Sequence, residues 1–296
     1  LPHHLVLGMS AMVTEAATWW PSRYGADDQA GALNEIGPDN VVGAARLVRQ
    51  GRVYDLAHVL HMDVPAFEGR MFCQELDAPE SVPGPHGLGF VIERVHAPSQ
   101  MGTHLDALNH LHKDGRTYNG HRVADITASY GTTKLGADTL PQIVTRGLLV
   151  DVAARRGVAR LDAGDVITPD DVAGLDVRPG DAVLFHTGWG RLWHEDPATY
   201  GSGEPGPGMA LAEWLADHRV ALTGCDTWSY GPVPAEDPDQ PFVVPQTLNT
   251  RHGVIVVENL FLSDLARDAV AEFLLVIAHP KLSGATGAWV APLAIV

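Results

Sequence analysis

The residues with the clearest chemical potential lie in the run SQMGTHLDALNH, residues 99–110. In an extended strand successive side chains point to opposite faces, so Gln100, His104 and Asp106 would project from the same side. Gly102 takes the remaining position on that face and would leave room for an ion. An imidazole, a carboxylate and an amide oxygen are suitable ligands for a divalent cation. The pattern predicts a metal site; a strand whose polar residues make ordinary hydrogen bonds is the alternative.

His110 follows Asp106 by four residues. If the chain turns into a helix after the strand, His110 stays on the same side as the metal ligands. From there its imidazole could take a proton from a metal-activated water and return it to a leaving group. His110 is therefore the predicted general base.

The same segment resembles the HxGTHxDxPxH signature of the metal-dependent cyclase/hydrolase superfamily, which includes bacterial kynurenine formamidase and isatin hydrolase. Further segments fit the family pattern, namely residues 23–60, 140–153, 178–193, 224–228, 253–262 and 281–296. The resemblance implies an α/β fold of the swivelling β/β/α barrel-like type, a single domain over residues 9–296, and a homodimer or homotetramer.

The chain departs from the family pattern at the metal site. Gln100 replaces the first signature histidine, and Leu108 replaces the proline. The histidine that relatives carry about a dozen residues before the ENL glutamate is missing from VVPQT, residues 243–247. Glu258 matches the family's acidic position. The resemblance thus implies a ligand set of Gln100, His104, Asp106 and Glu258, with one divalent ion, Mn²⁺ or Zn²⁺; a neutral amide ligand suits Mn²⁺ better.

The expected activity is hydrolysis of a small cyclic amide, lactone, imide or N-formyl amide by a metal-activated water, with His110 and Glu258 as catalytic residues. Two alternatives remain open at this stage. One is a non-hydrolytic cyclase or dehydratase of secondary metabolism, and the other is a metal-free binding protein that kept the fold.

Three residues are candidates for substrate binding. His186 ends the apolar run AVLFH at a place where relatives shape the site, and Trp228 could form a wall of it. Arg70 lies in residues 62–88, a segment rich in proline and glycine that is expected to roof a pocket.

Interleaved strand and helix patterns support the α/β class. The clearest predicted strands are residues 53–57, 90–95, 147–152, 182–186 and 220–224, and the clearest helices are residues 40–49 and 209–218.

Composition limits the partners. The net charge of −16 and the pI near 5.2 argue against nucleic acid and anionic membranes. No apolar run approaches the roughly 20 residues that span a bilayer. Cys73 and Cys225 are far apart and form no CxxC pattern, so a disulfide framework is not expected and a cytoplasmic location is favoured. The partner expected from the activity is a small-molecule substrate. Residues 1–8 resemble a cloning remnant or a disordered end, and Trp19 and Trp20 could pack against a partner subunit.

Overall fold

The computed structural model describes residues 18–77, 85–87 and 89–296, and its main feature is a nine-stranded mixed sheet. Residues 1–8 lie outside the described part of the chain. In spatial order the strands are β1 (Val53–Asp55), β15 (Leu293–Ile295), β13 (Glu272–Ile277), β7 (Ile143–Asp151), β9 (Ala182–His186), β11 (Leu222–Cys225), β12 (Ile255–Glu258), β4 (His104–Asp106) and β14 (Gly287–Trp289).

The middle of the sheet is parallel and its two flanks are antiparallel. Strands β7, β9, β11 and β12 run in the same direction, and every residue of β9, β11 and β12 is buried. Such strands need apolar side chains on both faces, which explains why they read as continuous apolar runs in the sequence. At one flank, β4 pairs antiparallel with β12 and with β14.

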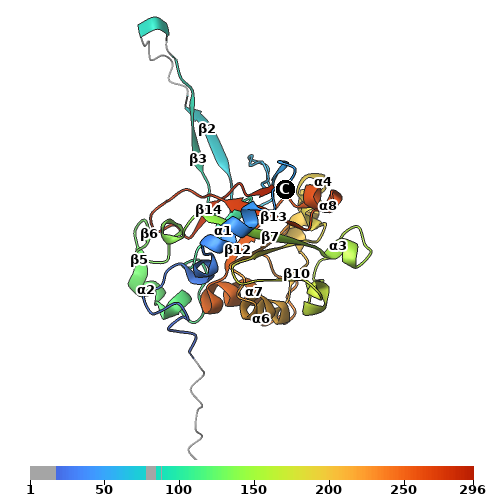
Figure 1. Cartoon of the computed structure of the whole chain (residues 1–296). Helices are drawn as coiled ribbons and strands as arrows, with labels where there is room; N and C mark the ends of the chain where they lie inside the picture. Colours follow the sequence, from blue (N-terminus) through green and yellow to red (C-terminus); the bar gives the residue numbers. More distant parts are fainter. Residues whose placement is uncertain (1–17, 78–84, 88) are drawn as a thin grey trace, which may run out of the picture.

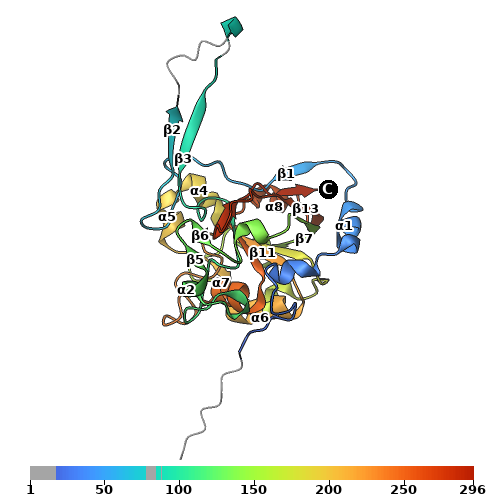
Figure 2. The ribbon, with the colours of Figure 1, turned by 90° about the vertical axis from the view of Figure 1, so that its left-hand side faces the viewer.

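Helices cover both faces of the sheet. Alternate residues of β7 and β9, such as Leu148 and Val183, pack against helix α6 (Met209–Asp217). Their neighbours Leu149 and Leu184 point into a second core that includes Leu265 of helix α8 (Ser263–Arg267). Figures 1 and 2 show α6 on the lower side of the sheet and α8 on the upper side.

The remaining helices are short. They are α1 (Pro38–Ala45), α2 (Val123–Ile126), α3 (Val152–Arg155), α4 (Leu192–Glu195), α5 (Pro197–Ser202) and α7 (Val243–Thr247). The helix expected at residues 40–49 is therefore α1, which begins and ends earlier, and the helix expected at residues 209–218 is α6. Three small two-stranded sheets pair β2 (Cys73–Asp77) with β3 (Ile92–His96), β5 (Thr127–Ala128) with β6 (Gly131–Thr132), and β8 (Val166–Ile167) with β10 (Gly206–Pro207).

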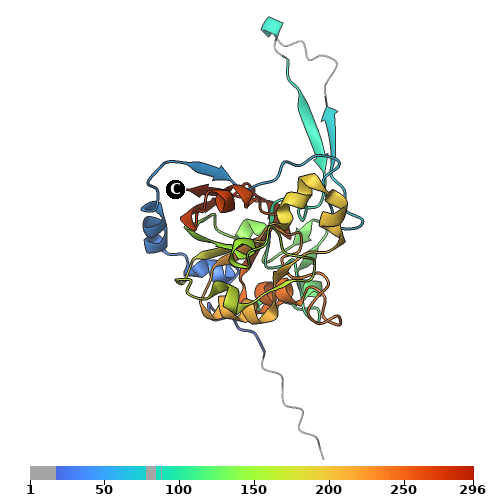
Figure 3. The ribbon, with the colours of Figure 1, turned by 90° about the vertical axis from the view of Figure 1, so that its right-hand side faces the viewer.

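The pair β2 and β3, called the arm below, stands away from the body in all three views (Figures 1–3). All five residues of β3 are exposed, and Leu76 of β2 is 70% exposed. The expectation that the whole segment 62–88 roofs a pocket is therefore wrong, because part of that segment leaves the body as a strand of the arm.

The α/β class is confirmed, and the swivelling β/β/α description stays a prediction. Within the described residues, no helix combines the length and the apolar character needed to cross a membrane. The Trp20 ring packs against Gly120 and beneath the Arg116 guanidinium, 4.9 Å away. This half of the Trp19–Trp20 pair therefore contacts its own chain.

Candidate metal centre and substrate cleft

Two neighbouring strands bring three potential ligands together. His104 and Asp106 are two residues apart on β4, so they share a face, and Glu258 of β12 lies opposite His104 in the antiparallel register. The three side chains are only 1%, 2% and 7% exposed. Nε2 of His104 lies 3.3 Å from Oε2 of Glu258 and 3.6 Å from Oδ1 of Asp106. The strand pairing therefore builds a buried His/Asp/Glu cluster.

The cluster fits a divalent cation. One potential ligand atom from each residue lies within 4.8 Å of the others. Nδ1 of His104 is 2.8 Å from the carbonyl oxygen of Gly102, which can only accept, so Nδ1 carries the proton and Nε2 presents its lone pair. Neither Nε2 of His104 nor Oδ1 of Asp106 has a hydrogen-bond partner. Buried polar atoms are costly when they are unpaired, and a shared cation would satisfy them.

Burial sets the electrostatics of the cluster. It raises the pKa of Asp106, with the neighbouring Glu258 adding to the effect, and it raises the pKa of Glu258 to about 8. Burial lowers the pKa of His104. Each shift favours the uncharged side chain, whereas a bound cation would favour the two ionised carboxylates.

His110 lies beside this cluster, as the sequence predicts, although the chain does not enter a helix there. A turn, in which the backbone N–H of His110 donates to Ala107, brings Nε2 of His110 to 3.8 Å from Oδ1 of Asp106. Nδ1 of His110 is 3.4 Å from Nε2 of Gln100, whose amide also donates to Thr286 at 3.1 Å. Gln100 therefore contacts the proposed base, and its role as a metal ligand stays a prediction.

The expectation that Gly102 leaves room for an ion is wrong. Its φ is +58°, and a Cβ at this position would lie 2.2 Å from a methyl carbon of Leu60. Gly102 therefore makes room for Leu60 and for a left-handed bend, not for an ion. A different glycine serves Gln100: a Cβ on Gly287, which faces Asp106 from β14, would lie 2.7 Å from the Gln100 amide nitrogen.

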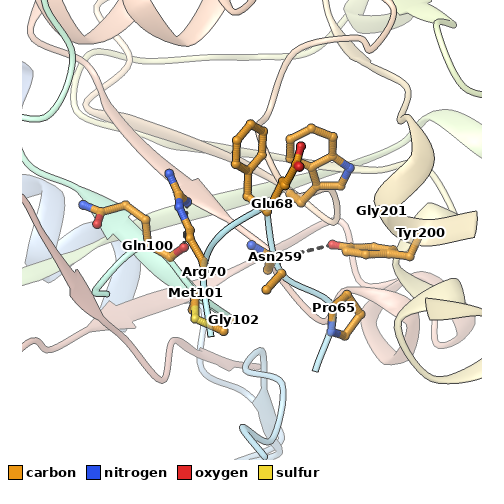
Figure 4. A pocket seen from close by; sticks show the side chains of 12 residues that line it. Pro65, Glu68, Arg70, Gln100, Met101, Gly102, Tyr200, Gly201 and Asn259 are labelled. Carbon is orange, nitrogen blue, oxygen red and sulfur yellow. Dashed lines mark hydrogen bonds between the residues drawn. The ribbon is translucent and has the colours of Figure 1, made fainter. Parts of the chain in front are cut away.

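Two adjoining clefts open beside the cluster, and both are lined by Phe67, Arg70, Gln100 and Trp228. The first also contains Asp106, His110, Ser229, Phe242 and Glu258. The second contains Glu68, Met101, Tyr200 and Asn259, and it is drawn in Figure 4. The structure thus brings Arg70 and Trp228, two of the predicted substrate-binding residues, to the metal cluster.

Three rings form an aromatic wall in these clefts. The ring centroids of Phe67 and Trp228 are 5.6 Å apart, and Phe242 lies 6.3 Å from each of them. The sequence analysis missed Phe67 and Phe242, since neither belongs to a spaced motif and they lie 175 positions apart in the numbering. Only the folded chain shows that they belong together.

Buried polar groups hold this wall and the metal cluster in place. The carboxylate of Glu204, which is fully buried, accepts hydrogen bonds from the backbone N–H groups of Trp228 and Ser229 at 2.5 and 3.0 Å. Asn259, which follows Glu258 at a φ of +54°, accepts a 2.7 Å hydrogen bond from Tyr200 (Figure 4). These contacts fix the loop after β11 and the end of β12.

His186 is not among the residues that line the two clefts. Its Nδ1 is 2.9 Å from Oδ1 of Asp151, so it joins the ends of β9 and β7 instead of facing the aromatic wall. His252, which follows the segment without the family histidine, pairs with Glu213 at 3.1 Å.

Comparison with known proteins identifies the family. The family model named Cyclase matches residues 54–232, which is more than half of the chain. The chain belongs to the cyclase family. The match includes the β4 residues of the cyclase signature and ends before Glu258, which joins them through the pairing of β12 with β4.

Solved structures share the cyclase fold. The chain is similar to a crystal structure of a novel cyclase, with 28% identity over 92% of this chain and 98% of the other and a TM-score of 0.83. It also resembles isatin hydrolase A from Labrenzia aggregata bound to benzyl benzoate, with 20% identity, coverage of 83% and 93%, and a TM-score of 0.61. An isatin hydrolase bound to the product analogue thioisatinate has 19% identity, coverage of 90% and 97%, and a TM-score of 0.65. No protein with a curated function matches the sequence.

Proposed function

We propose that this cyclase-family protein is a metal-dependent hydrolase of small aromatic carbonyl compounds, of the cyclic amide, lactone, imide or N-formyl amide type. The observation that carries the proposal is the buried cluster of His104, Asp106 and Glu258. Nε2 of His104 and Oδ1 of Asp106 are unpaired, and Asp106 and Glu258 line a cleft that also contains three aromatic rings. A binding protein would have no need for two buried carboxylates and an unpaired imidazole nitrogen beside its ligand. Hydrolysis uses them to hold the ion that activates water.

The donor set favours Mn²⁺ or Zn²⁺ in this proposal. One imidazole and two carboxylates suit either ion, and an amide oxygen from Gln100 would shift the preference towards Mn²⁺. When bound, the ion would supply the Lewis acidity that lowers the pKa of water and polarises a carbonyl.

The protein residues divide the remaining work among them. His110 borders the cleft near Asp106 and acts as the general base. Phe67, Trp228 and Phe242 hold a flat substrate against the cluster and keep bulk water away from it. Glu258 serves as a metal ligand, and its ionised carboxylate supplies part of the negative charge that balances the ion.

The similar structures favour hydrolysis over a non-hydrolytic reaction. Proteins of the same fold include isatin hydrolases, one of them bound to a product analogue and another to an aromatic ester. Because the sequence identities are near 20%, the names of these structures support the proposal that this chain is a hydrolase and go no further.

The test is elemental analysis followed by a hydrolase screen. We expect about one Mn²⁺ or Zn²⁺ per chain, hydrolysis of at least one member of a set of formanilides, isatin-like imides and aryl lactones, loss of activity with a chelator, and recovery with added metal. Turnover that is unaffected by full metal removal would contradict the proposal. So would a protein that binds neither ion.

A further inference from the structure

Arg70 is held at the junction of the two clefts with most of its donors free. Its Nη1 donates to the backbone carbonyl of Gln100 at 2.8 Å, and its guanidinium carbon lies 5.2 Å from the centre of the Phe67 ring. Figure 4 shows the side chain of Arg70 beside Gln100. A guanidinium has five N–H donors, and within the described residues no carboxylate lies within ion-pair distance of this one. Arg70 is thus anchored but not neutralised.

The charges around the cluster leave the positive charge of Arg70 without a counterpart once a metal is bound. The carboxylates of Asp106 and Glu258 would balance a divalent ion, and His104 would bind it as a neutral ligand. Among the residues that line the two clefts, Arg70 is the only arginine or lysine. Glu68 borders one cleft and forms no ion pair with Arg70 among the contacts of the described chain. The charge of Arg70 partly offsets the burial that raises the pKa of Asp106 and of Glu258, but no carboxylate of the described residues contacts the guanidinium directly. The cleft therefore presents a positive charge without a contacting counterion beside three rings.

We propose that Arg70 binds a carboxylate carried by the substrate, so that the preferred substrates are aromatic acids whose ring lies against Phe67, Trp228 and Phe242. The inference rests on the proposed function and deepens it by naming a substrate class. A guanidinium forms two parallel hydrogen bonds with a carboxylate, and stacking on a ring keeps its plane fixed for this contact. With a net charge of −16 the protein as a whole repels anions, so an acidic substrate needs such a local partner.

Equilibrium binding of benzoate and of the neutral benzamide, which have the same ring, provides the test. In the metal-loaded protein we expect benzoate to bind at least about 10-fold more tightly, since its contact with the guanidinium is charge-assisted. Arg70→Gln should abolish this preference, and Arg70→Lys should keep part of it. Arg160→Gln is the matched control, because the Arg160 guanidinium lies 5.2 Å from the Trp189 ring in a separate cleft. That control should keep the full preference.

Two results would overturn the inference: equal affinities in the wild type, or a benzoate preference that persists in Arg70→Gln, since the metal would then be binding the carboxylate. A second measurement uses 2-formamidobenzoate and 2-formamidobenzamide as substrates. We expect Arg70→Gln to raise KM for the acid about 10-fold or more with little change for the amide. If no compound of the hydrolase screen is turned over while benzoate binding still depends on Arg70, the proposed function fails and the assignment of Arg70 stands.

Discussion

At the scale of single residues, the orientation of His104 is the decisive feature of the site. Its Nδ1 is tied to a backbone carbonyl, which aims the Nε2 lone pair at two carboxylates. His186, by contrast, has its Nδ1 paired with Asp151 at the ends of β7 and β9, outside the two clefts. The two histidines therefore have different roles. His104 can present Nε2 to a cation because Nδ1 is bound to a carbonyl, whereas His186 links two strand ends through Nδ1.

Asp106→Asn should remove most of the bound metal. The amide keeps the size of the side chain but loses the charge of a strong ligand, so we expect at least a 10-fold weaker affinity for Mn²⁺ and Zn²⁺. Metal content after dialysis, measured by elemental analysis, checks this. His252→Ala, which alters a histidine paired with Glu213, should leave the content unchanged. Undiminished metal in Asp106→Asn would exclude Asp106 as a ligand.

His110→Ala should keep the metal and lower kcat by about 10²- to 10⁴-fold, the usual contribution of a positioned proton-transfer group. Its Nε2 lies near Asp106, and three potential ligands are already present on other residues. Kinetics and metal analysis on the same preparation separate the possible roles. Loss of metal would make His110 a ligand, and full activity with full metal would remove it from the mechanism.

The metal-free protein should lose stability as the pH rises. Burial raises the pKa of Glu258 from 4.5 to about 8, so between these values the folded protein holds a proton that the unfolded chain releases. The stability from this neutral group is present at low pH and is lost as the pH rises through 8. We expect Tm of the chelated protein to fall between about pH 5 and pH 8, and to fall less in Glu258→Gln.

Added Mn²⁺ should reverse this trend, because the ion binds the ionised form of the carboxylate. Thermal unfolding followed by circular dichroism across the pH range measures both effects. A Tm that stays constant or rises in the chelated wild type would show that Glu258 is ionised without metal.

At the scale of elements, the sequence predicts contacts within one strand better than contacts between strands. Alternation along β4 is enough to place His104 and Asp106 on one face. Glu258 joins them only through the pairing of β12 with β4, which no local pattern contains, so it was identified from the family resemblance alone. Gln100 reaches the site from a bend outside β4, and not by the alternation first assumed.

The aromatic wall shows the same limit of prediction from sequence. Phe67 lies before the arm and Phe242 before α7, and their contact with Trp228 depends on how three loops pack over the sheet. Long buried strands and amphipathic helices such as β9 and α6 were predicted well, since their periodicity is set by burial. Loops carry no such periodicity, so Phe67 and Phe242 could be assigned to the cleft only from the structure.

At the scale of the whole molecule, the arm is the feature whose stability the contacts within one chain do not explain. A two-stranded ribbon is only marginally stable by itself in water. This one exposes large apolar side chains, with exposed fractions of 47% for Ile92 and 44% for Val95, and Val91, which directly precedes β3, is 65% exposed. The arm also joins the cleft directly, because Phe67 and Arg70 lie just before it and Gln100 lies just after it. A second copy of the chain is the partner that the family resemblance predicts.

We therefore expect the protein to form a dimer or tetramer in which the arm is buried. Replacing Val91, Ile92 and Val95 together by serine should shift the protein to monomers, because the loss of three apolar contacts weakens a standard-sized interface by several orders of magnitude in dissociation constant.

Val42→Ser provides a control, since Val42 is 50% exposed on α1, away from the arm. Light scattering at micromolar concentration measures the mass of each protein. A monomeric wild type would refute the expectation of self-association, and an oligomer that survives the triple substitution would locate the interface elsewhere. Because the arm adjoins Arg70 and Gln100, a monomeric variant should also show weaker binding of benzoate, which would link assembly to the cleft.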